Sequence, residues 1–386
     1  MKKIYMDHAA TTPVRPEALT AMQPYFSKRF GNPSSLHFLG QEAKHALEKS
    51  RPKVANLIGA NPSEIIFTSG GTEANNLVLI GTAFANRSRG NHIITSKIEH
   101  HAILDTCHWL EKQGFEVTYL PVDKQGMVDP KKAEESIRKD TVLVSIMHAN
   151  NEIGTLQPIE EIGKICHEKG ICFHTDAVQS VGKVPIDVEK MDTDMLSMSS
   201  HKLYGPKGVG ALFVKSGTRL QSTMHGGGQE SGLRSGTENI TGIVGFAKAA
   251  ELAKKEIKQE SRRLTQLRNN LTKGILRIEN SSLTGHPEKR LPNNAHFCFK
   301  YIEGEALILT LSDYGIAAST GSACSSKSLE PSHVLLAMGM KHEEAHGSLR
   351  LTLGRANTKQ DVDYVIKVMP GIVGKLRKIS PFKRGW

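Results

Sequence analysis

The sequence predicts an α/β protein, with a large domain on a mainly parallel sheet and a smaller α+β domain towards the C-terminal end. The chain has 386 residues, which at roughly 150 residues per domain suggests about two domains. Short apolar, β-branched runs alternate with helical patterns between residues 60 and 215, and such alternation is typical of parallel sheets. Further strand-like runs follow a long helical pattern in the last third of the chain.

Seven short apolar segments of the first part are predicted as strands. They are residues 65–67, 93–95, 117–119, 142–146, 171–174, 195–197 and 210–214. Helical patterns, such as residues 159–169, lie between most of them. Pro52 interrupts the helical pattern of residues 41–58, so we expect a kink or a break near residue 51.

The C-terminal part begins with a helical pattern over residues 251–278. Beyond it, residues 295–299, 316–319 and 348–353 are predicted as strands of the smaller domain. Because a helix and not a flexible linker forms the boundary, we expect the two domains to pack tightly. We therefore divide the chain into an arm, residues 1–15, that packs with the small domain, a large domain, residues 16–255, and a small domain, residues 256–386.

The composition excludes several classes of protein. No apolar run approaches the ~18 residues of a membrane span, and the first residues do not resemble a secretory signal. The five cysteines are odd in number and contain no C-x-x-C pair, which argues against a disulfide framework or a structural zinc site. We expect a cytoplasmic protein with reduced thiols and no membrane association.

The chain is basic, with 50 Lys and Arg against 39 Asp and Glu and a net charge of +11. This charge suits a nucleic acid, an anionic cofactor or an acidic protein partner, and equally a basic solvated surface. The basic clusters contain no interleaved aromatic residues for base stacking. We therefore expect no direct binding of nucleic acid.

Ligands of open α/β sheets bind beyond the carboxyl ends of the strands, so the residues that follow each strand are informative. After the first strand comes Thr-Ser-Gly-Gly-Thr-Glu, residues 68–73, and then an apolar helical pattern. A glycine turn before a helix is a candidate phosphate cradle, although an ordinary capped turn has the same pattern. The segment lacks the spacing of a dinucleotide-binding glycine motif or a P-loop.

Three more polar side chains follow predicted strands: His100, Asp176 and Lys202. His100 suits proton transfer or stacking on a planar ligand, and equally a polar helix start. Asp176 at the end of an apolar strand is costly to bury unless it is paired or caps a helix. Lys202 lies between an apolar strand and a Gly-Pro turn, where a desolvated lysine becomes a nucleophilic amine. Together with the phosphate cradle, these groups fit pyridoxal 5'-phosphate (PLP).

A series of short motifs extends this interpretation over essentially the whole chain. They are GNPSS at 31–35, TSGGTE at 68–73, EH at 99–100, NNEIG at 150–154, DAVQS at 176–180, SSHK at 199–202, HGGGQE at 225–230, RSGT at 234–237, GSAC at 321–324 and LR at 349–350. In kind and order they resemble cysteine desulfurases of the NifS/IscS type, fold-type-I PLP enzymes of the class V aminotransferase superfamily.

The resemblance implies roles for the residues around the cofactor. Lys202 would form the Schiff base, and Asp176 would keep the pyridinium nitrogen protonated. His100 would stack on the ring and move protons, Gln179 would hydrogen-bond the phenolic oxygen, and Asn151 would lie close to the ring. The phosphate would be held by Gly71, Thr72, Ser199 and His201, together with Thr237 of the partner subunit in an obligate homodimer. Arg350 would clamp the substrate carboxylate, with help from Asn32.

Cys324 lies in a small polar stretch, residues 319–328, which predicts an exposed loop. Buried filler suits Cys172 and Cys298 on strands but not this position, and nearby Lys327 favours a thiolate. The resemblance makes Cys324 the sulfur acceptor. L-cysteine would give L-alanine and a Cys324 persulfide, whose sulfur passes to an iron–sulfur scaffold protein or to acceptors for tRNA thiolation. No resident metal is implied, and Cys324 is a candidate transient ligand of an iron–sulfur cluster.

Other functions stay open at this point. One is another class V PLP enzyme, such as a selenocysteine lyase, a cysteine lyase or an aminotransferase that does not need Cys324. A nucleic-acid-binding protein would use the charge of +11. A catalytically inactive paralogue is disfavoured because Lys202, Asp176, His100 and Cys324 are all present. Ser231, where many relatives have Arg, is the main departure from the family pattern.

Overall fold

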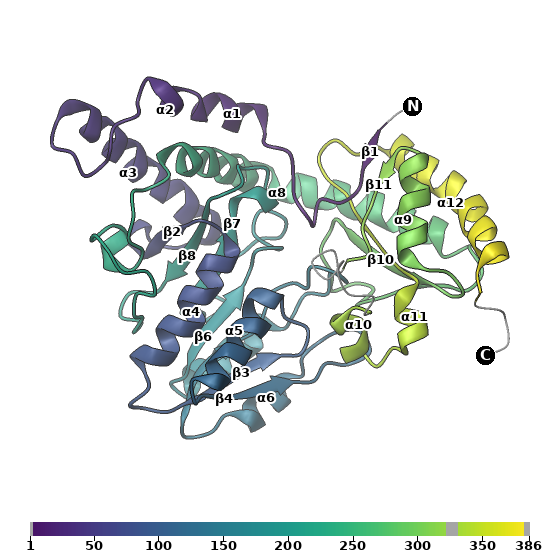
Figure 1. Cartoon of the computed structure of the whole chain (residues 1–386), viewed down its shortest axis with the longest axis horizontal. Helices are drawn as coiled ribbons and strands as arrows, with labels where there is room; N and C mark the ends of the chain where they lie inside the picture. Colours follow the sequence, from purple (N-terminus) through teal and green to yellow (C-terminus); the bar gives the residue numbers. More distant parts are fainter. Residues whose placement is uncertain (1–2, 322–330, 382–386) are drawn as a thin grey trace.

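The computed structural model describes residues 3–321 and 331–381. Figure 1 shows a large α/β body and a smaller body, with a long helix passing from one to the other. Within the described residues, no helix is both long enough and apolar enough to cross a membrane.

The large body is built on a seven-stranded sheet, as predicted. Its strands are β2 (Ile65–Thr68), β3 (His92–Ser96), β4 (Glu116–Leu120), β5 (Thr141–Ser145), β6 (Cys172–Asp176), β7 (Met195–Ser199) and β8 (Gly210–Val214), in the spatial order β2-β8-β7-β6-β5-β3-β4. All neighbouring strands are parallel except β8, which is antiparallel to both β2 and β7. Residues 200–209 between β7 and β8 are too few for the crossover that a parallel strand needs.

Helices cover both faces of this sheet. They are α3 (Phe38–Ile58), α4 (Gly71–Ala85), α5 (His101–Lys112), α6 (Pro130–Ser136), α7 (Ile159–Glu168) and α8 (Ile240–Ile275), preceded by the short α1 (Pro16–Met22) and α2 (Pro24–Ser27). Apolar side chains of α3, α6, α7 and α8 share one core cluster with the sheet, and those of α4 and α5 share another. The sheet is therefore the middle of three layers. The helices cover its faces and not the ends of its strands, where a site can form.

Two expectations about helices need correction: a break at Pro52 and the start of the long helix. The helix α3 continues through Pro52 without a break, because its buried face packs in the core cluster beside α8, and tertiary packing can outweigh a proline cost of ~3 kcal/mol. The helix α8 begins at Ile240, well before residue 251, and the side chain of Asn239 caps it by accepting the Gly242 N–H. The boundary predicted between residues 255 and 256 falls inside α8, so the division into domains stays a prediction.

The smaller body contains the strands predicted for it. Antiparallel β9 (Ser281–Leu283), β10 (Asn294–Phe299) and β12 (Ser348–Thr352) form a sheet in the order β12-β10-β9, and β1 (Ile4–Tyr5) pairs in parallel with β11 (Ile316–Ala317). The helices are α9 (Gly304–Asp313), α10 (His333–Ala337), α11 (His342–His346) and α12 (Lys359–Ile379). The C-terminal half of α8 shares their apolar core, so one continuous helix contributes to both bodies.

Candidate active site

Most of the predicted site residues meet at the carboxyl ends of the central strands. One cavity of about 130 Å³ is lined, among others, by Gly71, Thr72, His100, Asn151, Asp176, Gln179, Ser199, His201 and Lys202. They come from the end of β6, the end of β7 with the short 3-10 helix η2 (Ser200–Lys202), the first turn of α4, the residue before α5, and the turns after β5 and β6. The topology therefore gathers residues that are far apart in the sequence.

The other predicted residues lie elsewhere. Asn32 is exposed, and its Oδ1 accepts the Ser34 N–H in a local turn. Thr237 is also exposed and does not line this cavity. Arg350 lies on β12 and contacts the main chain of Asn151. Cys324, with the loop predicted around it, lies outside the described residues.

One end of the cavity is a cradle of main-chain groups at the start of α4. Gly70 precedes the helix without any side-chain cap, so the N–H groups of the first turn are available to an anion. A Cβ atom on Gly71 would lie 2.6 Å from the Val178 side chain, and only glycine fits there without a shift. A second cavity of about 420 Å³ shares Gly71 and Ser199 and adds Lys207, which supplies positive charge.

Asp176 also lines the cavity and is 6% exposed. Its Oδ1 accepts the Val178 N–H at 2.9 Å, and its Oδ2 accepts the Asn75 side-chain N–H at 2.7 Å. Within the described residues Asp176 belongs to no ion pair, and the Asn75 Oδ1 is buried without a hydrogen-bond partner. A buried carboxylate held by neutral donors suits a protonated ring nitrogen. Sequence reasoning missed Asn75, although it lies one helical turn after Gly71.

The chain segment of residues 7–12, called here the N-terminal strap, contacts several residues that line the cavity. The Lys202 Nζ donates to the carbonyl oxygens of Ala9 at 2.6 Å and of Ala10 at 2.8 Å. The Gln179 side-chain N–H donates to the same Ala9 oxygen at 3.0 Å. Thr11 Oγ1 lies 3.1 Å from His201 Nδ1. The strap was predicted only to pack against the small domain, and its contacts with the site were not foreseen.

Burial keeps the two histidines of the cavity neutral. It lowers the pKa of His201 to about 4, and the nearby Lys202, Lys207 and Lys183 lower it further. Burial also lowers the pKa of His100, while the Asp176 carboxylate opposes this effect. The His100 Nδ1 accepts the Ala102 N–H at 3.0 Å, so its ring proton lies on Nε2. A neutral imidazole in this tautomer presents an N–H donor to a ligand.

Lys183, another residue that sequence reasoning missed, fixes the orientation of Gln179. Its Nζ donates to the Gln179 main-chain oxygen at 2.7 Å and to Oε1 at 3.3 Å. Burial lowers the pKa of Lys183 to about 7, with additional effects from the positive Lys202 and Arg350. The Gln179 amide therefore turns its oxygen to Lys183 and its N–H donors to the strap and the cavity.

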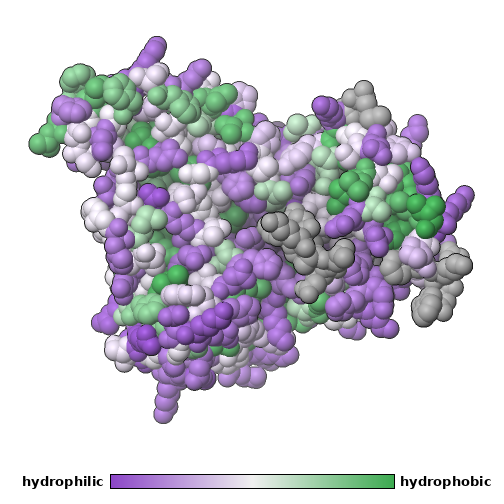
Figure 2. All heavy atoms as spheres, in the orientation of Figure 1, coloured by the Kyte–Doolittle hydropathy of each residue, from purple (hydrophilic) through white to green (hydrophobic). Residues whose placement is uncertain are grey.

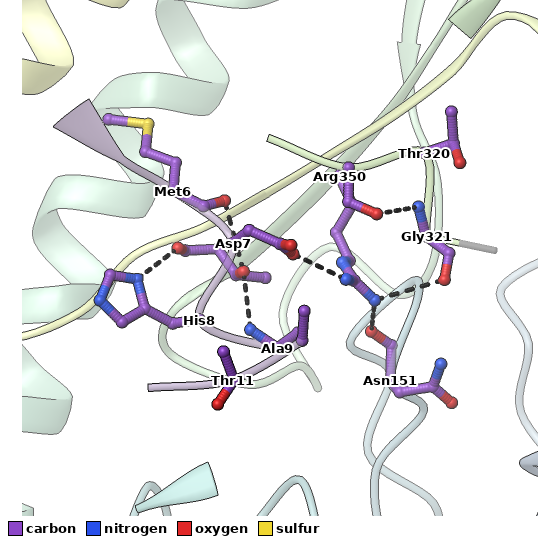
Figure 3. Close-up of polar contacts among 12 residues, drawn as sticks. Met6, Asp7, His8, Ala9, Thr11, Asn151, Thr320, Gly321 and Arg350 are labelled. Carbon is purple, nitrogen blue, oxygen red and sulfur yellow. Dashed lines mark hydrogen bonds and ion pairs between the residues drawn. The ribbon is translucent and has the colours of Figure 1, made fainter. Parts of the chain in front are cut away.

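Arg350 is 3% exposed and is held by three chain segments (Figure 3). Its Nη2 donates to Asp7 Oδ1 at 2.8 Å, in the strap. Its Nη1 donates to the carbonyl oxygen of Asn151 at 2.9 Å and to that of Gly321 at 3.4 Å. The guanidinium is thus fixed beside Asn151, which lines the cavity.

The four described cysteines are poor nucleophiles. Cys107, Cys166 and Cys298 are buried, and Cys172 on β6 is half-buried. Burial is the first cause that raises the pKa of each thiol, to about 12 for Cys166 and Cys298 and well above the ordinary value for Cys107 and Cys172. A high pKa leaves little thiolate at neutral pH. These thiols behave as the apolar filler that was predicted for Cys172 and Cys298.

The donor set fits PLP as a cofactor. The α4 turn provides an anion site, Asp176 provides a buried carboxylate, and Lys202 provides an amine within the same cavity. These are the three groups that PLP chemistry needs from a protein. The neutral His100 and His201 add N–H donors without adding a charge that would compete with Lys202.

Glu99, which precedes His100, gives a testable prediction about pH. It is fully buried, accepting the Ser96 hydroxyl at 2.6 Å and the Met147 N–H at 3.0 Å, and burial raises its pKa to about 8. Folding therefore takes up a proton between about pH 5 and pH 8, and stability falls as pH rises through this window by up to about 1.4 kcal/mol per pH unit. Glu99→Gln, which cannot titrate, is expected to remove this slope.

The measurement is the unfolding temperature of the variant and the parent between pH 5 and pH 8.5. The unfolding temperature of Glu99→Gln should rise relative to that of the parent as pH increases. Glu168→Gln, on the exposed face of α7, is the matched control and should follow the parent. Parallel curves for Glu99→Gln and the parent would contradict a protonated Glu99.

Comparison with known proteins supports the fold and the motifs. Residues 4–365 match the family model for aminotransferase class-V. The chain is 58% identical over 380 residues to cysteine desulfurase IscS of Methanosarcina thermophila, covering 98% of this chain and 94% of that protein. A solved NifS-like protein has a TM-score of 0.92 at 41% identity, covering 97% of this chain and 100% of the other.

A second solved structure, of SspA in complex with cysteine, has a TM-score of 0.82 at 41% identity. It covers 91% of this chain and 99% of that chain. Because these matches span nearly the whole length of both partners, they confirm the predicted fold class and the resemblance on which the motifs were assigned.

Proposed function

Because the chain belongs to the class V aminotransferase family, we propose that it is a PLP-dependent cysteine desulfurase. The observation that carries this proposal is the single cavity in which Lys202, Asp176 and the α4 glycine turn meet. The full-length similarity to proteins named cysteine desulfurase narrows the family to this activity. The similar structure that holds cysteine agrees with L-cysteine as the substrate.

The residues of the proposed site have the following roles when PLP is bound. Lys202 would hold the cofactor and carry the proton of the substrate Cα, Asp176 would bind the ring nitrogen, and His100 would stack on the ring. Bound PLP withdraws electrons from the bonds at Cα. The Gln179 amide and Asn151 lie beside the ring, and Arg350, with Asn32, holds the substrate carboxylate. The phosphate would be held by Gly71, Thr72, Ser199 and His201 of this chain and by Thr237 of the partner subunit.

The sulfur leaves through Cys324. Its thiolate attacks the sulfur of the substrate, so that a new S–S bond forms as the Cβ–S bond breaks, and Cβ gains a proton. L-cysteine and one thiol become L-alanine and one persulfide, with no oxidant or reductant consumed. The raised thiol pKa values of Cys166 and Cys298 support this assignment, because they leave no better nucleophile among the described cysteines.

The site is completed in a homodimer. Thr237 is exposed on this chain, as a residue that serves the partner's cavity must be before association. Figure 2 shows apolar side chains gathered over α1, α2 and the start of α3. The exposed members of this surface are Leu19, Phe26, Phe30, Leu36 and Phe38. An apolar surface of this kind is typical of a subunit interface.

The persulfide sulfur goes to a protein acceptor. We propose an iron–sulfur scaffold protein as the main acceptor, consistent with the name of the IscS relatives, with tRNA-thiolation acceptors as further recipients. A persulfide survives in a reducing compartment only while it is protected and rapidly used, and the thiol must be regenerated. Because the cytoplasm keeps thiols reduced, it can regenerate the Cys324 thiol, and we propose that the protein acts there.

The test is to incubate the purified PLP-loaded protein with L-cysteine and measure alanine and protein-bound persulfide together. Without a reductant, we expect one alanine per persulfide and no more than one persulfide on each chain. With a thiol reductant, alanine and sulfide should both accumulate over many turnovers. An aminotransferase would give the oxo acid without alanine. A selenocysteine lyase would act on selenocysteine and leave cysteine intact.

A further inference from the structure

Among the described residues, the guanidinium of Arg350 has hydrogen-bond donors without a partner. Its three bonds, to Asp7, Asn151 and Gly321, use the Nη1 group and one N–H of Nη2. The Nε atom is buried and has no hydrogen-bond partner among the described residues. A buried donor without a partner is costly. The Nε–H and the second N–H of Nη2 are therefore the donors from which a second carboxylate can be held.

The Asp7 carboxylate already binds one N–H of the Arg350 guanidinium. The Asp7 carboxylate and Arg350 form an ion pair at 2.8 Å, with side chains that are 18% and 3% exposed. Solvent screens such a pair much less than a surface pair. A substrate carboxylate that approaches the remaining donors therefore meets a guanidinium whose charge is partly offset, and it meets the negative charge of Asp7 nearby.

We propose that Asp7 is a positioning residue that acts through Arg350 and limits how tightly the amino-acid carboxylate is held. This inference rests on the proposed role of Arg350. Substrate and product carry the same carboxylate, so a stronger clamp would bind both more tightly and would not favour the reaction step. Asp7 keeps the clamp weak enough for L-alanine to leave.

Removal of the Asp7 charge does not release Arg350 from its place. The two bonds of Nη1 to the carbonyl oxygens of Asn151 and Gly321 are independent of Asp7. The side chain of an asparagine at position 7 would still offer an oxygen acceptor to Nη2. The main effect of Asp7→Asn is therefore electrostatic, and the orientation of the guanidinium is retained.

The experiment uses the full-length holoenzyme and measures the Kd of L-alanine from the change in visible absorption of the cofactor. Asp7→Asn is expected to lower this Kd about tenfold, and to lower KM for L-cysteine in parallel. Alaninamide, which lacks the carboxylate, should bind to variant and parent equally. An unchanged or higher Kd for alanine in Asp7→Asn, or an equal change for alaninamide, would overturn the proposal.

Three further variants show whether a change in the alanine Kd comes from the charge of Asp7 or from another effect of the substitution. Asp7→Glu keeps the charge and should leave the alanine Kd within about twofold of the parent. Asp7→Ser should reproduce the tightening and replaces Asp7→Asn if that variant does not fold. Asp363→Asn, in an exposed ion pair on α12, controls for loss of a carboxylate elsewhere and should have no effect.

Arg350→Gln tests the premise separately. It should weaken alanine binding at least about 100-fold, while alaninamide binding changes little. If Arg350→Gln leaves the alanine Kd unchanged, the proposed role of Arg350 fails. If Arg350→Gln weakens binding but Asp7→Asn does not tighten it, only the inference about Asp7 fails.

Discussion

Lys202→Ala is expected to abolish the visible absorption of the covalently held cofactor and to lower desulfurase activity at least about 1000-fold. Lys202 is the amine of the cavity, and its Nζ lies against the carbonyl oxygens of Ala9 and Ala10. Alanine removes both the nucleophilic nitrogen and the group that carries the substrate proton. The measurement is the visible spectrum of the purified variant after PLP is added, together with the rate of alanine formation.

The contacts of Lys202 with the strap need their own control. Lys202→Ala leaves the Ala9 and Ala10 oxygens without this donor, so part of its effect could come from a displaced strap. Lys202→Arg retains donors for those oxygens but cannot form the covalent bond, and it should be equally inactive. Lys190→Ala, at a highly exposed lysine, should match the parent. A normal spectrum in Lys202→Ala would refute the assignment.

Cys324→Ser is expected to lower alanine formation from L-cysteine at least about 1000-fold and to prevent protein-bound persulfide. A serine hydroxyl is far less ionised than a thiol at neutral pH and a much weaker nucleophile toward sulfur. The change should leave PLP binding intact, because none of the proposed cofactor contacts uses Cys324. Alanine, persulfide and the visible spectrum are measured on the same preparation.

The matched control is Cys172→Ser on β6. Cys172 is half-buried, and burial raises its pKa, so its loss should leave both products unchanged. If Cys324→Ser still forms alanine at the parent rate, sulfur does not leave through a persulfide on this residue. If Cys172→Ser is the inactive variant, the acceptor has been assigned to the wrong cysteine.

Local patterns in the sequence predicted the sheet and much of the cavity. The strands ending at Asp176 and just before Lys202 are short and apolar, and the parallel topology places their ends at one edge. The antiparallel direction of β8 could have been predicted from the sequence, because residues 200–209 are too few for a crossover connection. The early start of α8 could have been found from Asn239, a good helix cap.

Other features depend on contacts that no local pattern carries. Asp7 and Arg350 are 343 residues apart in the chain, and only the folded structure pairs them. Lys183 appears in the sequence as an ordinary lysine, and its low pKa arises from burial beside other cations. The break expected at Pro52 is absent because α3 packs in the core cluster, which is a tertiary effect. Asn32 and Thr237, like Asn151, Gln179 and Arg350, were assigned from the family resemblance alone.

The N-terminal strap has a consequence for the order in which the protein is made. Residues 7 and 8 are translated long before their partners Arg350 and Thr352 on β12. The seven-stranded sheet can assemble during synthesis, since β2 to β8 all precede residue 215. The clamp cannot. Until β12 has emerged, a nascent chain therefore lacks the contact between Asp7 and Arg350, and the proposed carboxylate clamp is incomplete.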